Sequence, residues 1–396
     1  WEGARQDFTD KHKQDLPAAF ARLAQQGKVE LLTTAMTHGF LPAHQNAVSR
    51  RLQIELGVQR FTELTGIDPA GFWLPECAYF PGLENDLAAA GVRWFGVEDM
   101  GGPRVRECPN GVTAIARDTA LSRVVWDARS GYPGHAAYRE FHRDAAHELS
   151  NEQAGLYRTP DGTTLPLGMK YWAVTGGAEK SFYEPDVAIA QARSDADDFA
   201  AAIDAESASG LTFLPFDAEL FGHWWFEGPT FLSHFMAQSA TGRDFTLSTP
   251  TAALADMADL PVKRPIASTW GRQADFSYWV NHETDWIYPL LAQADATFAH
   301  LAESWDEPDF SPEQTLRNRA LRQLIRELLL AQASDWPFMI RGGATANYAR
   351  ERIQRHLARF HYLATQLTTG TIDANTLAAL ESLDPILPEL PLDTVL

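Results

Sequence analysis

The sequence is poor in cysteine and has no long apolar run. Cys77 and Cys108 are its two cysteines, too few for a disulfide scaffold, and we expect both to be reduced thiols. No run of about eighteen apolar residues occurs, so we expect no membrane-spanning helix and no membrane partner. Residues 1–15 do not resemble a signal peptide. Together these absences predict a soluble, cytoplasmic protein.

Basic residues are also in short supply. The 33 Lys and Arg residues face 52 Asp and Glu residues, which gives a net charge of −19. A chain of this charge is repelled by nucleic acid and by anionic membranes, so neither is expected as a partner. A neutral polymer remains compatible with it. Aromatic residues, by contrast, are frequent (11%, with twelve Trp), which suits stacking on sugar rings, although most of these rings must belong to the core.

The histidines lack the spacing of a metal site. Four that could serve as ligands lie far apart, and no H-E-x-x-H motif occurs: His38, His44, His223 and His282. We therefore expect no metal and no cofactor. A zinc site assembled from distant histidines stays an alternative, because some sugar-cleaving enzymes and deacetylases on related barrels use zinc.

Strands and helices alternate in the first part of the chain. Strands are predicted over residues 29–34, 72–74 and 92–97, with helices between them. This alternation is typical of parallel strands joined by right-handed crossovers. From residue 99 to residue 168 the chain is rich in Gly, Pro and Arg and loses its periodicity, which predicts an inserted, loop-rich subdomain.

Alternation then resumes, and the last third is helical. We predict a strand over 171–174, a helix over 185–205 and a strand over 211–216. Further helices are predicted over 288–301, 312–333, 345–367 and 373–383. The predicted division has four parts: 1–98 and 169–260 as two parts of one catalytic domain, 99–168 as the insertion, and 261–396 as a C-terminal helical domain.

The stretch GFWLPECAYFPG, at residues 71–82, places a carboxylate at the end of a short strand. Apolar and aromatic residues surround this acid, Glu76. An ionised acid in such surroundings is costly unless a polar or cationic group supports it, and such acids are frequent in active sites. The alternative is that Glu76 only caps the helix that follows.

A second stretch, at residues 211–232, repeats the pattern. An apolar strand ends on Asp217, and Glu219, His223 and Glu227 follow. Ligands bind at the carboxyl ends of strands in helix-flanked sheets, so Glu76 and Asp217 could face one another across a cleft. A pair of carboxylates amid aromatic side chains is what glycoside chemistry requires.

Six segments carry a resemblance to a known family. In chain order they are THGFLP (37–42), WLPECAY (73–79), MKYWAVTG (169–176), FDAELFGHWWFEGP (216–229), WGRQADFSYWVN (270–281) and ASDWPF (333–338). They resemble the signature segments of glycoside hydrolase family 57. The Cys after the glutamate and the WWFEG sequence are most similar to the 1,4-α-glucan branching enzymes of that family.

The resemblance implies a fold and a mechanism. The fold would be α/β, a distorted (β/α)7-type barrel with an insertion and a C-terminal helical domain. Glu76 would be the nucleophile of a retaining double displacement and Asp217 the acid/base, with Glu219 and Glu227 nearby as alternatives for the second role. Attack needs an ionised Glu76, so we expect an Arg or His beside it, and an apolar surround for Asp217.

The resemblance also implies substrate contacts and partners. The expected glucan-binding residues are His38, Trp172, Trp224, Trp270, Trp279 and Asp335, although a structural role is the alternative for any single His or Trp. The expected substrate is an α-1,4-glucan such as amylose or glycogen, bound by a monomer or weak oligomer. Alternatives are a hydrolase or 4-α-glucanotransferase of the same family, and a catalytically inactive glucan-binding protein.

Two family features differ here. The family opens with a strand that carries a His-x-His segment, which we expect to precede Trp1 in the complete catalytic domain. Related branching enzymes close a mobile loop over the active site, and the corresponding segment between Asp99 and Cys108 is short.

Overall fold

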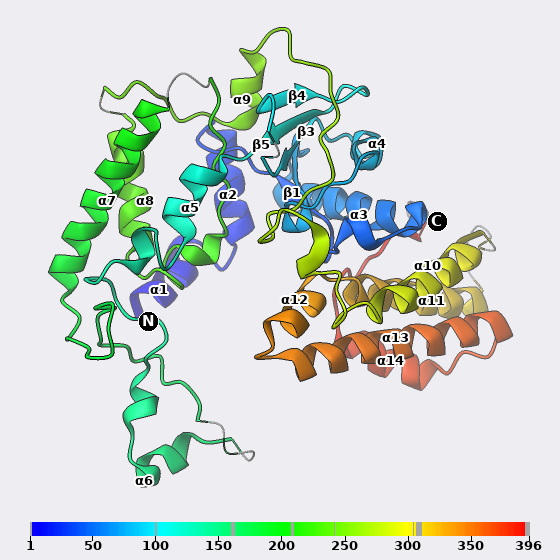
Figure 1. The fold of residues 1–396 in the computed structure, drawn as a ribbon. Helices are drawn as coiled ribbons and strands as arrows, with labels where there is room; N and C mark the ends of the chain where they lie inside the picture. Colours follow the sequence, from blue (N-terminus) through cyan, green and yellow to red (C-terminus); the bar gives the residue numbers. More distant parts are fainter. Residues whose placement is uncertain are drawn as a thin grey trace. The chain divides into compact units, whose positions relative to one another are not determined.

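The computed structural model describes residues 2–99, 101–159, 162, 164–206, 210–240, 242–303, 305 and 311–392. Two compact units make up the chain: Trp1–Ala116 with Thr249–Leu396, and Arg117–Ser248. We call them unit 1 and unit 2 (Figure 1). The predicted boundaries at residues 98, 168 and 260 stay a prediction. Met100, inside the segment where a closing loop was considered, lies outside the described residues.

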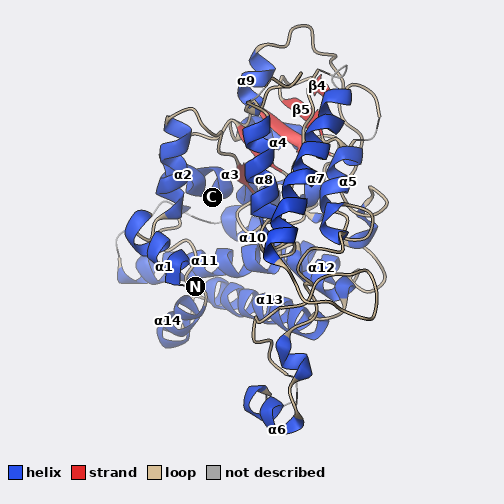
Figure 2. Ribbon diagram, turned by 90° about the vertical axis from the view of Figure 1, so that its left-hand side faces the viewer, coloured by secondary structure: helices blue, strands red, loops and turns tan. Residues whose placement is uncertain are grey.

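Unit 1 contains a five-stranded sheet of order β1-β2-β3-β5-β4. Its strands are β1 (Thr33–Thr34), β2 (Gly71–Trp73), β3 (Trp94–Val97), β4 (Val105–Glu107) and β5 (Thr113–Ala116). All neighbours are parallel except β4 and β5. The predicted parallel sheet is therefore confirmed, and its closure into a barrel stays a prediction. The strands are short and lie together (Figure 2).

The sheet packs through aromatic and aliphatic side chains. Phe72 and Phe95 are fully buried and lie opposite each other on β2 and β3. Tyr79 stacks on Phe95 with ring centroids 5.4 Å apart. Gly71 is required at the start of β2, because a Cβ there would lie 2.2 Å from the Trp94 indole. This packing fixes the end of β2, where Glu76 follows.

Unit 1 contains further helices before, between and after these strands. They are α1 (Glu2–Gln6), α2 (Leu16–Gln25), α3 (Ala47–Thr65), α4 (Leu83–Ala89) and α9 (Pro250–Ala255), with a π-helical turn at Asp7–Lys11. Local signals set the ends of α3. The Asn46 side chain accepts a hydrogen bond from the Val48 N–H at the start, and Gly66 adopts φ 68° at the end.

The C-terminal helices confirm the predicted helical domain. They are α10 (Ile287–Glu303), α11 (Pro312–Ala331), α12 (Asp335–Gly342), α13 (Ala346–Thr369) and α14 (Ala374–Leu383), and they lie side by side in Figure 1. Leu52 and Leu56 of α3 belong to the same buried cluster as residues of α10, α11, α13 and α14. These helices therefore share one core with α3.

Unit 2 is built on α5 (Thr119–Trp126), α7 (Pro185–Ala205) and α8 (Gly228–Gln238) around one apolar core. The predicted helix over 185–205 is confirmed. A short helix, α6 (Asn151–Ala154), lies in a segment that extends away from the other helices of the unit (Figure 1). None of the helices among the described residues of either unit is long and apolar enough to cross a membrane.

One loop prediction and two strand predictions need correction. The region from 99 to 168, predicted to be rich in loops, contains β4, β5 and α5. The two strands are too short to give a clear periodic pattern. Residues 171–174 form only single bridges, both antiparallel, through Trp172 with Phe182 and Ala173 with Arg139. In 211–216 only Phe213 pairs, with Arg117, since Pro215 cannot continue a ladder.

Candidate active site

Glu76 lies in a strained turn directly after β2. Pro75–Cys77 form a 3-10 turn in which Glu76 has φ 60° and ψ 22°, and Cys77 has φ 51°. Non-glycine residues in this left-handed region cost about 1–3 kcal/mol each and occur often at functional sites. The turn is held by the hydrogen bond from the Cys77 N–H to the Leu74 carbonyl (2.8 Å) and by the burial of Pro75 and Cys77. In this turn the half-buried Glu76 directly precedes a fully buried Cys77.

Two neutral donors hold the Glu76 carboxylate. The Ser334 hydroxyl donates to Oε1 at 2.7 Å, and the Trp270 indole N–H donates to Oε2 at 3.1 Å. The Trp270 backbone N–H also donates to the Glu76 carbonyl at 3.3 Å. We expected an Arg or His here, and the structure shows a hydroxyl and an indole instead. Both orient the carboxylate and stabilise negative charge on it.

Ser334 also joins Glu76 to His38. The Ser334 N–H donates to the His38 carbonyl at 3.0 Å, and Gly39 pairs with Ala333 in an antiparallel bridge. His38 has φ 55°, and its Nδ1 lies 3.3 Å from the Thr34 hydroxyl. Four of the expected site segments, those of His38, Glu76, Trp270 and Asp335, thus meet within unit 1.

Asp335 is exposed and begins α12, one residue after Ser334. It therefore follows the residue that binds Glu76, and its contact with a sugar stays a prediction. Sequence reasoning did not assign Ser334. A hydroxyl between apolar helices and directly before an acid is the signal that could have indicated it.

A buried polar network supports the segment around Ser334. The Gln332 amide nitrogen donates to Ser49 Oγ at 2.5 Å and to Asp295 Oδ1 at 2.9 Å, and Gln332 Oε1 accepts from Gln53 at 2.9 Å. Gln53 Oε1 in turn accepts from the Thr37 backbone N–H at 3.0 Å. The network therefore connects the two segments that flank Glu76, since Thr37 precedes His38 and Gln332 lies two residues before Ser334.

Burial shifts the pKa values of two groups in this network. It raises the pKa of Asp295 to about 6, against the opposing hydrogen bonds from Ser49 and Gln332. Burial, with Arg50 nearby, lowers the pKa of His44 to about 4. His44 Nδ1 and Asp295 Oδ2 lie 3.9 Å apart. Because His44 is neutral at physiological pH, this contact is not an ion pair there.

The two tryptophans expected near Glu76 differ in exposure. Trp270 is half-buried, and its ring lies 5.1 Å from the ring of Trp73. Trp279 is 2% exposed and stacks on Phe40 with ring centroids 5.2 Å apart. Its indole N–H finds no acceptor among the described residues. The structure thus places Trp279 in the core of unit 1, and its contact with glucan stays a prediction.

Asp217 belongs to unit 2. The preceding segment is anchored by the parallel bridge of Arg117 with Phe213 and by the Asp118 N–H to Phe213 C=O hydrogen bond (2.8 Å). Asp217 then begins the 3-10 turn Ala218–Leu220 and is half-buried. The sequence predicted a strand that ends on Asp217; in the structure the acid follows a segment with a single bridge, at Phe213, and begins a turn.

The two alternative acids have structural partners. Glu219 accepts a hydrogen bond from the Trp224 indole N–H at 2.9 Å. Glu227 is buried and accepts one from the Arg139 backbone N–H at 3.2 Å. His223 packs edge-on against Trp224, with ring centroids 5.2 Å apart. The acid/base role of Asp217 stays a prediction.

Trp224 lines a cavity of about 650 Å³ in unit 2. It is 44% exposed, and its ring centroid lies 4.5 Å from that of Phe141. Trp126 and Arg139 also line the cavity. A cavity of this size with aromatic walls and a few polar groups is typical of a small-molecule site. Sequence reasoning missed Trp126. Its place at the end of an amphipathic helix, before a Gly- and Pro-rich turn, was the available signal.

Comparison with known proteins decides the family. Residues 1–264 match glycosyl hydrolase family 57. The chain belongs to this family. Residues 291–394 match the C-terminal domain of 1,4-alpha-glucan branching enzymes, and they include α11, α13 and the segment of Ser334. The resemblance seen in the sequence is therefore confirmed.

Similar proteins support the family assignment. The family 57 chain is 31% identical to a 1,4-alpha-glucan branching enzyme of Thermococcus kodakarensis. The match covers 93% of the present chain but only 59% of the Thermococcus protein. Among solved structures, the alpha-amylase AmyC of Thermotoga maritima is 32% identical, with a TM-score of 0.86 over 98% of this chain and 77% of that one. A GH57-type branching enzyme of Pyrococcus horikoshii is 29% identical, with a TM-score of 0.85 over 98% and 75%.

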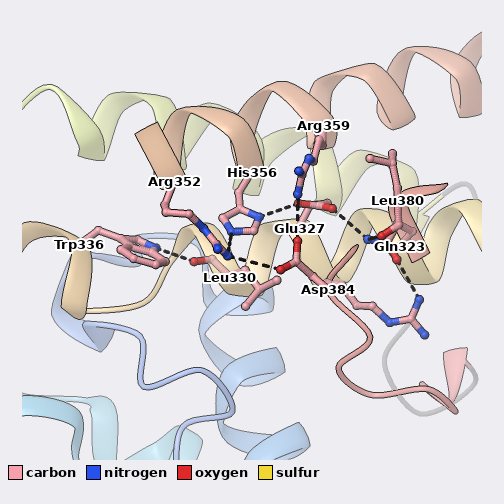
Figure 3. Close-up of polar contacts among 10 residues, drawn as sticks. Gln323, Glu327, Leu330, Trp336, Arg352, His356, Arg359, Leu380 and Asp384 are labelled. Atoms are coloured by element: carbon pink, nitrogen blue, oxygen red, sulfur yellow. Dashed lines mark hydrogen bonds and ion pairs between the residues drawn. The ribbon is translucent and has the colours of Figure 1, made fainter. Parts of the chain in front are cut away.

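One group of residues in the helical part of the family 57 chain has the composition of a metal site. Glu327, His356 and Asp384 place ligand atoms within 4.8 Å of one another, but Figure 3 shows two guanidinium groups among them. Arg352 contacts His356 at 3.1 Å and Asp384 at 3.4 Å, and Arg359 contacts Asp384 at 2.9 Å. Two guanidinium cations in these positions would repel a metal cation, so these residues form an ion-pair network.

Trp172, the last expected substrate-binding residue, lies in unit 2 in a hairpin. It is half-buried, its indole N–H donates to Glu148 at 2.6 Å, and its ring stacks on Phe182.

Proposed function

We propose that this chain is the catalytic part of a retaining 1,4-α-glucan branching enzyme. The observation that supports branching in particular is the match of residues 291–394 to the C-terminal domain of branching enzymes. These residues supply Ser334, which donates to Glu76. The helical domain thus provides a hydrogen-bond donor to the proposed nucleophile.

The proposed reaction has two steps. In the first, a Glu76 oxygen attacks the anomeric carbon, the α-1,4 bond breaks, and Asp217 gives its proton to the leaving 4-oxygen. In the second, the Asp217 carboxylate takes the proton of an acceptor 6-hydroxyl, whose oxygen attacks the anomeric carbon and releases Glu76. The product is an α-1,6 branch with retained configuration, and no cofactor takes part.

The surroundings of Glu76 suit this role. Ser334 and Trp270 each fix one carboxylate oxygen, so the side chain is held in one orientation before substrate arrives. Transfer in place of hydrolysis requires a bound acceptor and exclusion of water. The indole faces of Trp270 and Trp224, and the Trp126 wall of the cavity, are the surfaces that we propose for this purpose.

The proposed substrates are neutral α-1,4-glucans such as amylose and glycogen. A net charge of −19 does not hinder binding of an uncharged polymer. The proposed location is the cytoplasm, in agreement with the two free thiols Cys77 and Cys108. We propose a monomer or weak oligomer as the working state.

Product analysis tests the proposal. After incubation with amylose, a branching enzyme yields new α-1,6 linkages, which NMR of the anomeric protons detects. Glu76→Gln and Asp217→Asn should each abolish them while leaving the fold intact by circular dichroism. Unchanged activity in either variant contradicts the assigned roles.

Hydrolysis is the second candidate, favoured by the similarity to the alpha-amylase AmyC. Water would then attack the glycosyl-enzyme in place of a 6-hydroxyl, and reducing ends would rise without α-1,6 linkages. A structure with bound glucan tests the shared mechanism. Carboxyl groups of Glu76 and Asp217 about 5–5.5 Å apart indicate retention, and about 6.5–9.5 Å indicates inversion.

A further inference from the structure

A buried carboxylate follows Glu76 at the start of α4. It belongs to Glu84, whose side chain is fully buried in the first turn of this helix. Its Oε2 accepts hydrogen bonds from the Tyr79 hydroxyl and the Gly82 N–H, both at 2.8 Å, and its Oε1 accepts one from Arg264 Nε at 2.5 Å. Glu84 thus ties the chain just after Glu76 to a segment 180 residues further on.

The segment that begins at Arg264 brings Trp270 to the Glu76 carboxylate. Ser268 and Tyr79 form an antiparallel bridge, in which each N–H donates to the other residue's carbonyl, at 3.0 Å and 2.9 Å. Two residues later, Trp270 donates its backbone N–H to the Glu76 carbonyl and its indole N–H to Oε2. Residues 264–270 therefore run antiparallel to the chain that follows Glu76.

The Arg264–Glu84 pair lies between two other ties of this segment. On the far side from Trp270, the Lys263 N–H donates to the Glu107 carbonyl of β4 at 2.8 Å. On the near side, Ser268 is held by its bridge. The ion pair therefore fixes the path of the chain from the sheet edge to the site. Its charge-assisted hydrogen bond has a defined direction, which suits this use.

The surroundings of Glu84 leave it no part in proton transfer. Burial acts to raise the pKa of Glu84, but the hydrogen bonds from Tyr79, Gly82 and Arg264 outweigh it and lower the pKa below its usual range. Burial, with the Glu84 carboxylate nearby, raises the pKa of Tyr79, which stays a neutral donor. A fully buried carboxylate with three donors does not reach a substrate, so what it can supply to the site is position.

We propose that Glu84 and Arg264 are positioning residues that hold residues 264–270 in place, so that the Trp270 indole N–H meets the Glu76 carboxylate. The inference rests on the role of Glu76 proposed above. The alternative is that Arg264 only compensates the buried charge of Glu84. The two differ in whether loss of the pair is felt at Trp270.

The indole N–H resonance of Trp270 tests the proposal without turnover. In a chain with isotope-labelled tryptophan, Trp270→Phe identifies the resonance by its loss, and Glu76→Gln shows where it moves when the acceptor changes. Arg264→Met, which keeps an unbranched side chain without the charge, should move it in the same direction. Arg319→Met breaks another partly exposed Arg–Glu pair of unit 1, with Glu381, and should leave it in place.

A double-mutant cycle tests the same link in kcat on amylose. Arg264→Met should lower kcat about three- to tenfold, since displacement of an orienting group by about 1 Å can cost about a hundredfold. In the Trp270→Phe chain, which already lacks the indole N–H, Arg264→Met should change kcat by less than about twofold. Glu84→Gln should act as Arg264→Met does, and it replaces that variant if the latter does not fold.

The outcomes are separable. A Trp270 resonance that stays in place in Arg264→Met and Glu84→Gln overturns the positioning role. So do equal losses of kcat from Arg264→Met with and without Trp270→Phe. If the resonance moves but Glu76→Gln leaves the glucan products unchanged, the pair positions Trp270 and the proposed function falls. If Glu76→Gln abolishes turnover and the resonance stays in place, the positioning role alone falls.

Discussion

Glu76 receives both of its side-chain hydrogen bonds from residues far away in the sequence. Ser334 and Trp270 hold one oxygen each, and the backbone turn at Glu76 is in the left-handed region. The acid itself could be predicted, because an apolar strand that ends on Glu, with Pro and Cys beside it, is unusual. Its partners could not, because no local pattern indicates a donor 258 residues away.

Ser334→Ala should lower kcat, because the hydroxyl orients the Glu76 carboxylate. A hydrogen bond to a charged group contributes about 1.5–3 kcal/mol, so a rate loss of about ten- to a hundredfold is expected if the bond is needed in the transition state. Initial rates on amylose measure it. Ser268→Ala is the matched control, since Ser268 is also buried and its hydroxyl finds no partner among the described residues. Equal rates in the two variants would contradict a positioning role for Ser334.

Asp295→Asn should change how stability depends on pH. The pKa of Asp295 is higher in the folded protein, at about 6, than in the unfolded chain. Its contribution to the free energy of unfolding is therefore greatest below about pH 4 and is lost as the pH rises through 6. Asn keeps an oxygen for Ser49 and Gln332 but does not titrate.

The two proteins are compared by urea unfolding. The Asn variant should gain about 2–3 kcal/mol relative to the native chain between pH 4 and pH 7. His44 is present in both proteins, so its own titration cancels. Parallel pH profiles would show that Asp295 does not titrate in this range.

At the scale of elements, a buried Glu–His pair joins α11 and α13. Glu327 and His356 are fully buried and lie 2.6 Å apart, and Gln323 donates to the other Glu327 oxygen at 2.9 Å. Figure 3 shows Arg352 and Asp384 closing the network around them. Removal of one partner of such a pair leaves a charge in the core without compensation.

His356→Ala should therefore destabilise the helical domain by about 3 kcal/mol or more. Chemical denaturation followed by far-UV circular dichroism measures it. Gln354→Ala, at an exposed position on the same helix, should change stability by less than about 0.5 kcal/mol. A His356→Ala chain as stable as this control would mean that Arg359 alone compensates Glu327.

Long helices could be predicted much better than strands. The helix at 185–205 and the one near 288–301 were found because apolar residues recur with helical spacing over several turns. The strands have only two to four residues, and so short a segment carries no clear period. The hairpin that pairs Trp172 with Phe182 was missed because its antiparallel pairing depends on contacts across a turn.

For the molecule as a whole, the shared core of unit 1 decides which parts unfold together. Leu52 of α3 packs in the same cluster as Leu328 of α11 and Phe360 of α13, whereas α7 and α8 have a separate core in unit 2. We therefore expect the sheet-flanking helix and the C-terminal helices to unfold together.

Leu328→Ala should lower amide protection in α3 and α11 together, by about 3 kcal/mol. Native-state hydrogen exchange resolves the two helices. Phe235→Ala, in the core of unit 2, should lower protection in α7 and leave α3 unchanged. Loss of protection in α11 alone would show that the C-terminal helices open independently.

The hydrogen bond between Ser334 and Glu76 also has a consequence for the order of events during synthesis. A ribosome that adds about 5–20 residues per second needs roughly 13–50 s to pass from Glu76 to Ser334. Throughout that interval the nascent chain carries the proposed nucleophile without the hydroxyl that orients it. The site is thus completed only after Ser334 has been synthesised, and a chain terminated before Ser334 would lack it.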